Sequence, residues 1–293
     1  MRTIPLKDFF RNPEKTSYHI SPNGKFISYL APYNDRLNIF VQETTGSDAA
    51  KRITEATERD IYIYFWGNDN TIIYLRDNAG DENYHFYSVN IHTGINKDLT
   101  PFEGVRANLV DELEDFDSEI LIEMNKRNPE IFDVYRMNFE TGEMKMTAEN
   151  PGNISGWVTD HNGRIRAAIT TDGVNTSLLF RESEQDNWRT VITTNFKESL
   201  TPVFFTFDNE YLYASSNIDR DKSAIIKYDI KNAAELEVIY EHPDVDVNSL
   251  SYSKKRKVLT AVSFYTWKRE RVFLDEETKN IFERLEKELR NYE

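Results

Sequence analysis

Short stretches of alternating polar and apolar residues run along this 293-residue chain, separated by turn signals. In "ISPNGKFISYL", from Ile20 to Leu30, a Pro-Asn-Gly turn divides two such stretches. Proline presets φ, and Asn-Gly accepts a positive φ at low cost. Alternation with a period of two is typical of strands that bury one face. The stretch therefore predicts a β-hairpin.

The hairpin recurs six times at a nearly constant spacing. Its first turn residues are at positions 23, 69, 117, 162, 208 and 254, which are 45 to 48 residues apart. A second strand–turn–strand element follows each of the first five hairpins, and its turn is Thr-Gly in the first three. Four short strands in about 46 residues are typical of one blade of a β-propeller. We therefore predict an all-β propeller.

The repeats also predict the domain organisation. We expect a single propeller domain over 1–293, with blades at approximately 16–57, 58–104, 105–150, 151–197 and 198–243, and a partial blade at 244–274. Six blades are visible and the last is incomplete. Because the first blade begins almost at Met1, we expect a seventh blade, encoded downstream, to complete the ring in the full protein.

A helix is predicted after the sixth repeat, over 275–291. Asp275 is the expected N-cap, and acidic residues follow it in the first turn. The expected apolar stripe consists of Ile281, Phe282, Leu285 and Leu289.

Composition narrows the possible functions. The net charge of −14 argues against a nucleic-acid partner, because phosphate binding needs clustered Lys and Arg. The absence of cysteine excludes disulfides and thiolate nucleophiles. No run approaches the roughly 18 apolar residues of a membrane span, and the first residues have no apolar signal-peptide segment. We therefore expect no membrane association and a cytoplasmic location.

The blades and their surroundings resemble a known family. The pattern S-P-N-G-K-x-I-x-Y followed by T-G-x-x-x-x-L-T is similar to the TolB-type or PD40 blade, whereas the WD40 and kelch signatures are absent. The segments "PLKDFFRNPEKTSYHISPNGKFISYL", "LRDNAGDENYHFYSVN" and "FLDEETKNIFERLEKEL" resemble the N-terminal propeller of prolyl oligopeptidase-family serine peptidases. The most similar group is the bacterial acylaminoacyl-peptidase or dipeptidyl-peptidase-like branch.

The resemblance implies a function that needs a second domain. In that family a C-terminal α/β-hydrolase domain carries a Ser-Asp-His triad, and the propeller caps the active site and selects short peptides by size. This chain contains no G-x-S-x-G nucleophile elbow and no βαβ alternation. We therefore expect no catalytic residues here and no cofactor or metal. The expected partners are the hydrolase domain and short peptides.

The loop "RDNAGDEN" provides the first candidate site residues, Asp77, Asp81, Glu82 and Asn83. Gly80 suits a position with positive φ, and Asp81 and Asn83 are expected to make Asx turns. One interpretation is a loop-shaping motif. The other is a polar rim that faces the hydrolase domain and gates the substrate.

Arg127, in "MNKRNPEIFD", is the remaining candidate. A guanidinium group suits recognition of a peptide carbonyl or carboxylate through its forked donors. The family resemblance implies that an arginine or paired glutamates from the propeller lie near the substrate's amino end. No motif aligns Arg127 with that role.

Two other functions stay open. A stand-alone TolB-like propeller would bind a protein or peptide partner through one face. A propeller hydrolase acting on sugars would use carboxylates around a funnel, for which the acidic runs at 76–83 and 111–119 are the candidates. A run of acids in sequence, however, usually forms a solvated turn.

Overall fold

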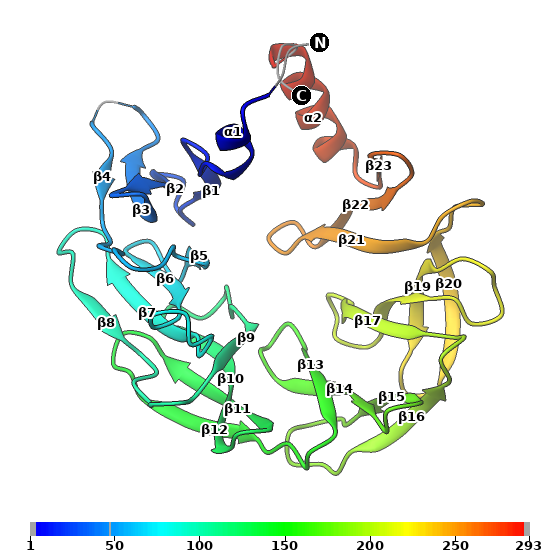
Figure 1. The fold of residues 1–293 in the computed structure, drawn as a ribbon. Coiled ribbons are helices and arrows are strands. Elements are labelled where there is room, and N and C mark those ends of the chain that lie inside the picture. Colours follow the sequence, from blue (N-terminus) through cyan, green and yellow to red (C-terminus); the bar gives the residue numbers. More distant parts are fainter. Residues whose placement is uncertain (1–3, 47, 290–293) are drawn as a thin grey trace. The chain divides into compact units, whose positions relative to one another are not determined.

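The computed structural model describes residues 4–46 and 48–289, which fold mostly into antiparallel β-sheets. They divide into two compact units, Met1–Gly152 and Asn153–Glu293. A short helix, α1 (Leu6–Phe10), precedes the first strand. Figure 1 labels the elements in chain order.

The first unit contains three four-stranded sheets in which consecutive strands pair antiparallel. The strands are β1 (Thr16–Ile20), β2 (Phe26–Tyr33), β3 (Arg36–Glu43) and β4 (Lys51–Arg52); β5 (Ile63–Trp66), β6 (Thr71–Arg76), β7 (His85–Asn90) and β8 (Asn96–Asp98); and β9 (Ala107–Asp111), β10 (Glu119–Asn128), β11 (Ile131–Asn138) and β12 (Met144–Ala148).

The second unit contains two four-stranded sheets and one three-stranded sheet of the same kind. The strands are β13 (Ile154–Thr159), β14 (Ile165–Thr171), β15 (Thr176–Phe180) and β16 (Arg189–Thr194); β17 (Leu200–Phe205), β18 (Leu212–Ser216), β19 (Ala224–Asp229) and β20 (Ala234–Tyr240); and β21 (Val247–Ser253), β22 (Val258–Tyr265) and β23 (Arg269–Phe273).

Within each unit, neighbouring sheets pack face to face, and β6 shows how its sequence allows this. Ile72 and Tyr74 are buried in a core shared with the first sheet. Ile73 and Leu75 are buried in a core shared with the third sheet. Successive side chains of a strand point to opposite faces. A run of consecutive apolar residues is therefore typical of a strand whose sheet is covered on both faces.

Hydrogen bonds between neighbouring sheets follow the sequence repeat. The backbone N–H of Asn23 donates to Asp69 Oδ1 at 2.9 Å, 46 positions along the chain. In the second unit the N–H of His161 donates to Asn209 Oδ1 at 2.8 Å, 48 positions along. Both bonds join the first turns of adjacent repeats. The regular spacing therefore reflects equivalent contacts between successive blades.

Helix α2 (Glu276–Glu288) follows β23, and its N-cap is the one that the sequence predicts. Asp275 accepts a hydrogen bond from the Thr278 N–H at 2.8 Å and forms an ion pair with Arg256 at 2.8 Å. The ring of Phe282 lies 5.2 Å from that of Phe273 in β23. The helix is thereby attached to the three-stranded sheet. Residues 290–291 of the predicted helix lie outside the described residues.

The predicted fold class is confirmed. The chain is an all-β protein built of TolB-like propeller blades, with an incomplete sixth blade and a helix near its C-terminal end. The sixth sheet ends with its third strand, and α2 follows where the other repeats have a fourth strand.

Candidate functional site

The turns of each sheet lie on two opposite sides, at the two ends of its strands, and each such side is called an edge below. In an up-and-down sheet, the turn between the second and third strands lies at the same edge as the link to the next sheet. We call this the connection edge. The opposite edge carries the turns between the first and second strands and between the third and fourth, and we call it the turn edge. All five candidate residues lie at connection edges of the first unit: Asp77, Asp81, Glu82, Asn83 and Arg127.

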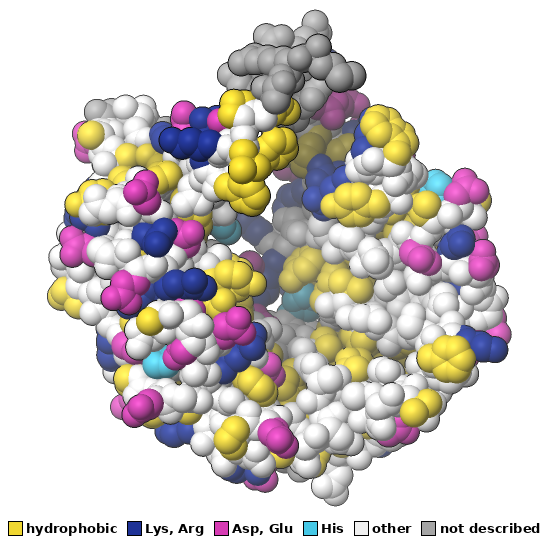
Figure 2. Space-filling model, viewed as in Figure 1, with side chains coloured by type: hydrophobic (Ala, Val, Ile, Leu, Met, Phe, Trp, Pro, Cys, Tyr) yellow, Lys and Arg dark blue, Asp and Glu magenta, His cyan; other side chains and the backbone are white. Residues whose placement is uncertain are grey.

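In the segments that join two strands, large apolar side chains are exposed mainly at the connection edges. In those segments, the exposed residues at the connection edges are Tyr62 in the first unit and Val174, Phe196 and Trp267 in the second. At the turn edges, the exposed residues within the described ranges are Ile95 between β7 and β8, and Leu274, Ile281, Leu285 and Leu289 after β23. Figure 2 shows apolar side chains gathered over α1 and near the β22–β23 turn. Within one unit, exposed apolar groups that gather on one face are typical of interaction surfaces.

The loop between β6 and β7 is shaped by Asp81, as the sequence predicts. Asp81 Oδ1 accepts hydrogen bonds from the N–H groups of Asn78 and Asn83, both at 3.1 Å, and Asn83 Nδ2 donates to Oδ2 at 3.3 Å. The slight loss of solvent around the exposed Asp81 works to raise its pKa, but these hydrogen bonds outweigh it and lower the pKa. Gly80 has φ +90°, and Glu82 has φ +59°. Asp81 therefore holds the loop in an unusual backbone shape.

Asp77 lies apart from the solvated loop residues, because its side chain is only 3% exposed. Its Oδ1 lies 3.4 Å from Nε of Arg59, which comes from the link between β4 and β5. Both residues line a cavity of about 420 Å³ at the connection edge. The structure thus brings Asp77 together with Arg59, which the sequence did not single out. Arg59 is a charged residue just before an aromatic strand, and that position is its only sequence signal.

Arg127, at the same edge of the third sheet, is bound within its own blade. Its Nε and Nη2 donate to the two oxygens of Asp133 at 2.8 Å, and Nη2 also donates to the carbonyl oxygen of Asn150 at 2.9 Å. Asp133 is fully buried. Burial works to raise the pKa of Asp133, and the Arg127 guanidinium outweighs it and lowers the pKa. The forked donors that a peptide would need are therefore directed at Asp133.

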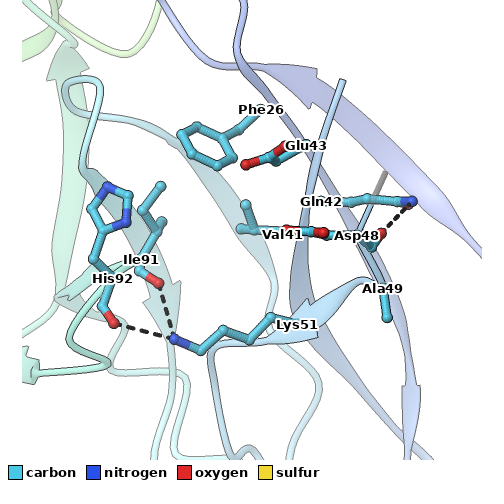
Figure 3. Close-up of a pocket in the computed structure, with 9 residues that line it drawn as sticks. All are labelled: Phe26, Val41, Gln42, Glu43, Asp48, Ala49, Lys51, Ile91 and His92. Carbon is cyan, nitrogen blue, oxygen red and sulfur yellow. Dashed lines mark hydrogen bonds between the residues drawn. The ribbon is translucent and has the colours of Figure 1, made fainter. Parts of the chain in front are cut away.

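A second, smaller pocket lies at the turn edge between the first two sheets. Figure 3 shows Lys51 reaching from β4 to the carbonyl oxygens of Ile91 and His92, at 3.2 and 3.3 Å. The ring of Phe26 meets that of His92 edge-on at 5.8 Å. The pocket holds about 240 Å³. Because Lys51 belongs to the first sheet and the two carbonyl groups follow β7 of the second, its ammonium group links these two sheets.

The acidic run at 111–119 forms the turn between β9 and β10. Burial, followed by the nearby charges of Glu114 and Asp111, raises the pKa of Glu112 to about 7. Within the described ranges no group of three His, Cys, Asp or Glu side chains could hold a metal ion. No helix in the described part of the chain is long and apolar enough to cross a membrane.

Comparison with known proteins identifies relatives of the chain. It is 30% identical over 224 residues to dipeptidyl aminopeptidase BIII of Pseudoxanthomonas mexicana, covering 75% of this chain and 32% of the relative. It is 24% identical over 284 residues to dipeptidyl peptidase family member 6 of Caenorhabditis elegans, covering 89% of this chain and 37% of the relative. The chain thus spans about a third of each. No family model matches.

A solved structure supports the same fold. A chain from a structural and mechanistic study of two prolyl endopeptidases matches with a TM-score of 0.65 and 10% identity, covering 90% of this chain and 42% of that chain. At that identity the match shows the fold alone. The peptidase relatives, the propeller blades and this fold agree with one another. The chain is thus a propeller related in sequence to dipeptidyl peptidases, and these findings are consistent with a β-propeller domain of the prolyl oligopeptidase family of serine peptidases.

Proposed function

We propose that the chain is the non-catalytic propeller part of a serine oligopeptidase or exopeptidase. In the full protein it caps the active site of an α/β-hydrolase domain and admits short peptides. The observation that supports this most is the set of exposed apolar side chains at the connection edges, including Trp267, which is 87% exposed. Such side chains are stabilised when a second domain covers them.

The selection of peptides by size follows from exclusion. A propeller seated on a hydrolase domain leaves only narrow routes to the nucleophile. A short, flexible peptide passes such a route, whereas a folded domain cannot pass without unfolding. The propeller would thereby protect folded proteins from hydrolysis without any catalytic group of its own.

Hydroxyl-radical footprinting tests the docking part of the proposal. The 293-residue chain and the native protein are labelled in parallel, and oxidation of each exposed side chain is quantified by mass spectrometry. We expect Tyr62, Phe196 and Trp267 to be protected in the native protein. Ile95, 69% exposed at the turn edge, is the internal control and should be labelled equally in both. Equal labelling of all four residues would favour a stand-alone binding module.

A competition between substrates tests the selection of peptides by size. The native protein is given one cleavable dipeptide sequence in two forms, as a free chromogenic dipeptidyl substrate and at the end of a folded protein. We expect hydrolysis of the free form and no measurable cleavage of the tethered form. Comparable rates on both would contradict selection by size.

A further inference from the structure

One buried carboxylate in the first unit is poorly satisfied. Oδ2 of Asp77 is buried and has no hydrogen-bond partner among the described residues. Oδ1 has the single 3.4 Å contact with Nε of Arg59, whose side chain is half exposed. Burying an ionised carboxylate without several hydrogen bonds is costly, so buried carboxylates are normally well paired. Asp77 is therefore suited to accept a further donor.

The neighbouring sheet shows what a satisfied carboxylate looks like. Asp133 accepts two hydrogen bonds from Arg127 at 2.8 Å and a third, also 2.8 Å, from the N–H of Asn150. Asp133 and Asp77 are both buried near the connection edge, but only Asp133 has a forked arginine partner. The arrangement at Asp77 thus differs from that of the other buried carboxylate described in this unit.

The cavity beside Asp77 suits a long cationic side chain. Its apolar and aromatic wall consists of Leu37, Ile61, Tyr62 and Tyr84. Ile61 is 2% exposed and Tyr62 is 69% exposed, so the lining extends from the interior to the surface. The rings of Tyr62 and Tyr84 lie 5.0 Å apart. Methylene groups pack well on such a wall, and a carboxylate among the buried lining residues attracts a cation.

The charges around the cavity also favour a cation. The lining carboxylates are Glu58, Asp60 and Asp77, and the lining guanidinium groups are Arg36 and Arg59. Asp60 Oδ1 accepts a hydrogen bond from the Leu37 N–H at 2.7 Å, so this carboxylate helps to shape the wall. The lining therefore has one more carboxylate than guanidinium group.

Arg59 occupies the position that an incoming cation would take. It meets Asp77 through one long contact, and its Cζ would stand 3.7 Å from a Cβ atom added to Gly80. An ion pair with one half-exposed partner and a single contact is weak. A second cation can therefore exchange with Arg59 at little cost.

We propose that this cavity binds the side chain of a lysine or arginine in a short peptide, whose cationic end replaces Arg59 at Asp77. The inference extends the proposed function by naming a class of peptide, and it rests on that function for its biological role. Its test measures binding alone. If the cavity does not bind these ligands, the footprinting result that tests the proposed function is unaffected.

The test uses NMR titration of the 293-residue chain with Nα-acetyl-lysine methylamide and Nα-acetyl-arginine methylamide. The norleucine derivative has the stem without the charge, and glycine methylamide has an ammonium group without the stem. We expect both basic ligands to bind at least about tenfold more tightly than either control, because a buried charge-assisted hydrogen bond contributes about this factor. Equal binding of the norleucine or glycine compound would overturn the inference.

Two variants should act in opposite directions. Arg59→Ala removes the competing cation and should tighten binding about tenfold, whereas Asp77→Asn should weaken it at least about tenfold. Glu103→Gln removes the same single negative charge at an exposed position outside the cavity, and it should not change the affinity. Thermal unfolding verifies that each variant is folded. Unchanged affinity in Arg59→Ala or in folded Asp77→Asn would contradict the proposed exchange.

Discussion

The ammonium group of Lys97 in β8 donates a 2.5 Å hydrogen bond to the carbonyl oxygen of Thr141 in the next sheet. Gly142 makes room for it, because a Cβ atom there would stand 2.7 Å from Nζ of Lys97. Lys51 makes the corresponding contact one sheet earlier, and Arg189 makes it in the second unit. A cation of the fourth strand thus binds the third-to-fourth turn of the following blade.

We therefore expect Lys97→Met to lower the free energy of unfolding by about 1 kcal/mol, the usual net contribution of one hydrogen bond. Urea unfolding monitored by tryptophan fluorescence measures the change. Lys255→Met is the matched control, because Lys255 is exposed in a turn of the last sheet. A Lys97 variant as stable as the control would show that the contact joins the blades without stabilising them.

Asp133→Ala should be much more damaging. It removes the acceptor of two guanidinium hydrogen bonds and of the hydrogen bond from the buried N–H of Asn150. We expect a loss of about 2–3 kcal/mol in the free energy of unfolding, measured in urea. Asp133→Asn keeps an acceptor and should lose less. Equal losses in both variants would contradict the hydrogen-bond explanation.

The same contacts give an expectation for Arg127. If its role is to hold Asp133, then Arg127→Lys should lower the unfolding temperature of the native protein and leave KM for short peptides unchanged. If it binds the substrate's amino end, as the family resemblance implies, KM should rise in a folded variant. Measuring both quantities on one preparation separates the two roles.

The stability of helix α2 should depend on pH through the carboxyl group of Asp275. Hydrogen bonds from Thr278, followed by the contact with Arg256, lower the pKa of Asp275 to about 2. A pKa below that of the unfolded chain means that the cap stabilises fully above about pH 4. The contribution is lost as the pH falls through about 2. NMR titration of the carboxyl group and hydrogen exchange of the Thr278 amide should show this, and Asp275→Ala should remove the dependence.

The carboxyl group of Glu112 should make the stability of the fold change with pH in the opposite direction. Burial raises the pKa of its carboxyl to about 7, so the folded chain holds a proton that the unfolded chain releases near its ordinary value. The stability of the fold should therefore fall as the pH rises from about 4.5 to 7. Glu112→Gln should be about 3 kcal/mol more stable than the parent at pH 8 and similar to it at pH 4. A pH-independent difference in urea unfolding would contradict this.

Local signals allowed much of the fold to be predicted. Turn residues such as Asn162-Gly163 recur at the blade period, and Asp81 and Asp275 form bonds within three residues of themselves. Such features depend on short stretches of backbone. The repeat, the loop motif and the cap were therefore visible before the structure.

The remaining features depend on residues that are distant in the sequence. Asp77 meets Arg59 across 18 positions, and Lys97 meets Thr141 across 44. No local pattern indicates which strand lies beside which at the level of one side chain. Asp133 is only six positions from Arg127, but burial of its carboxylate becomes apparent only when β10 and β11 are paired in a sheet.

The central claim is that this propeller belongs to a serine peptidase. It is tested most directly by labelling the native polypeptide with a fluorophosphonate probe, after capture with an antibody raised to this chain. The account predicts a labelled product about two and a half times as long as 293 residues, in proportion to the relatives. An unlabelled product of about 293 residues would contradict it.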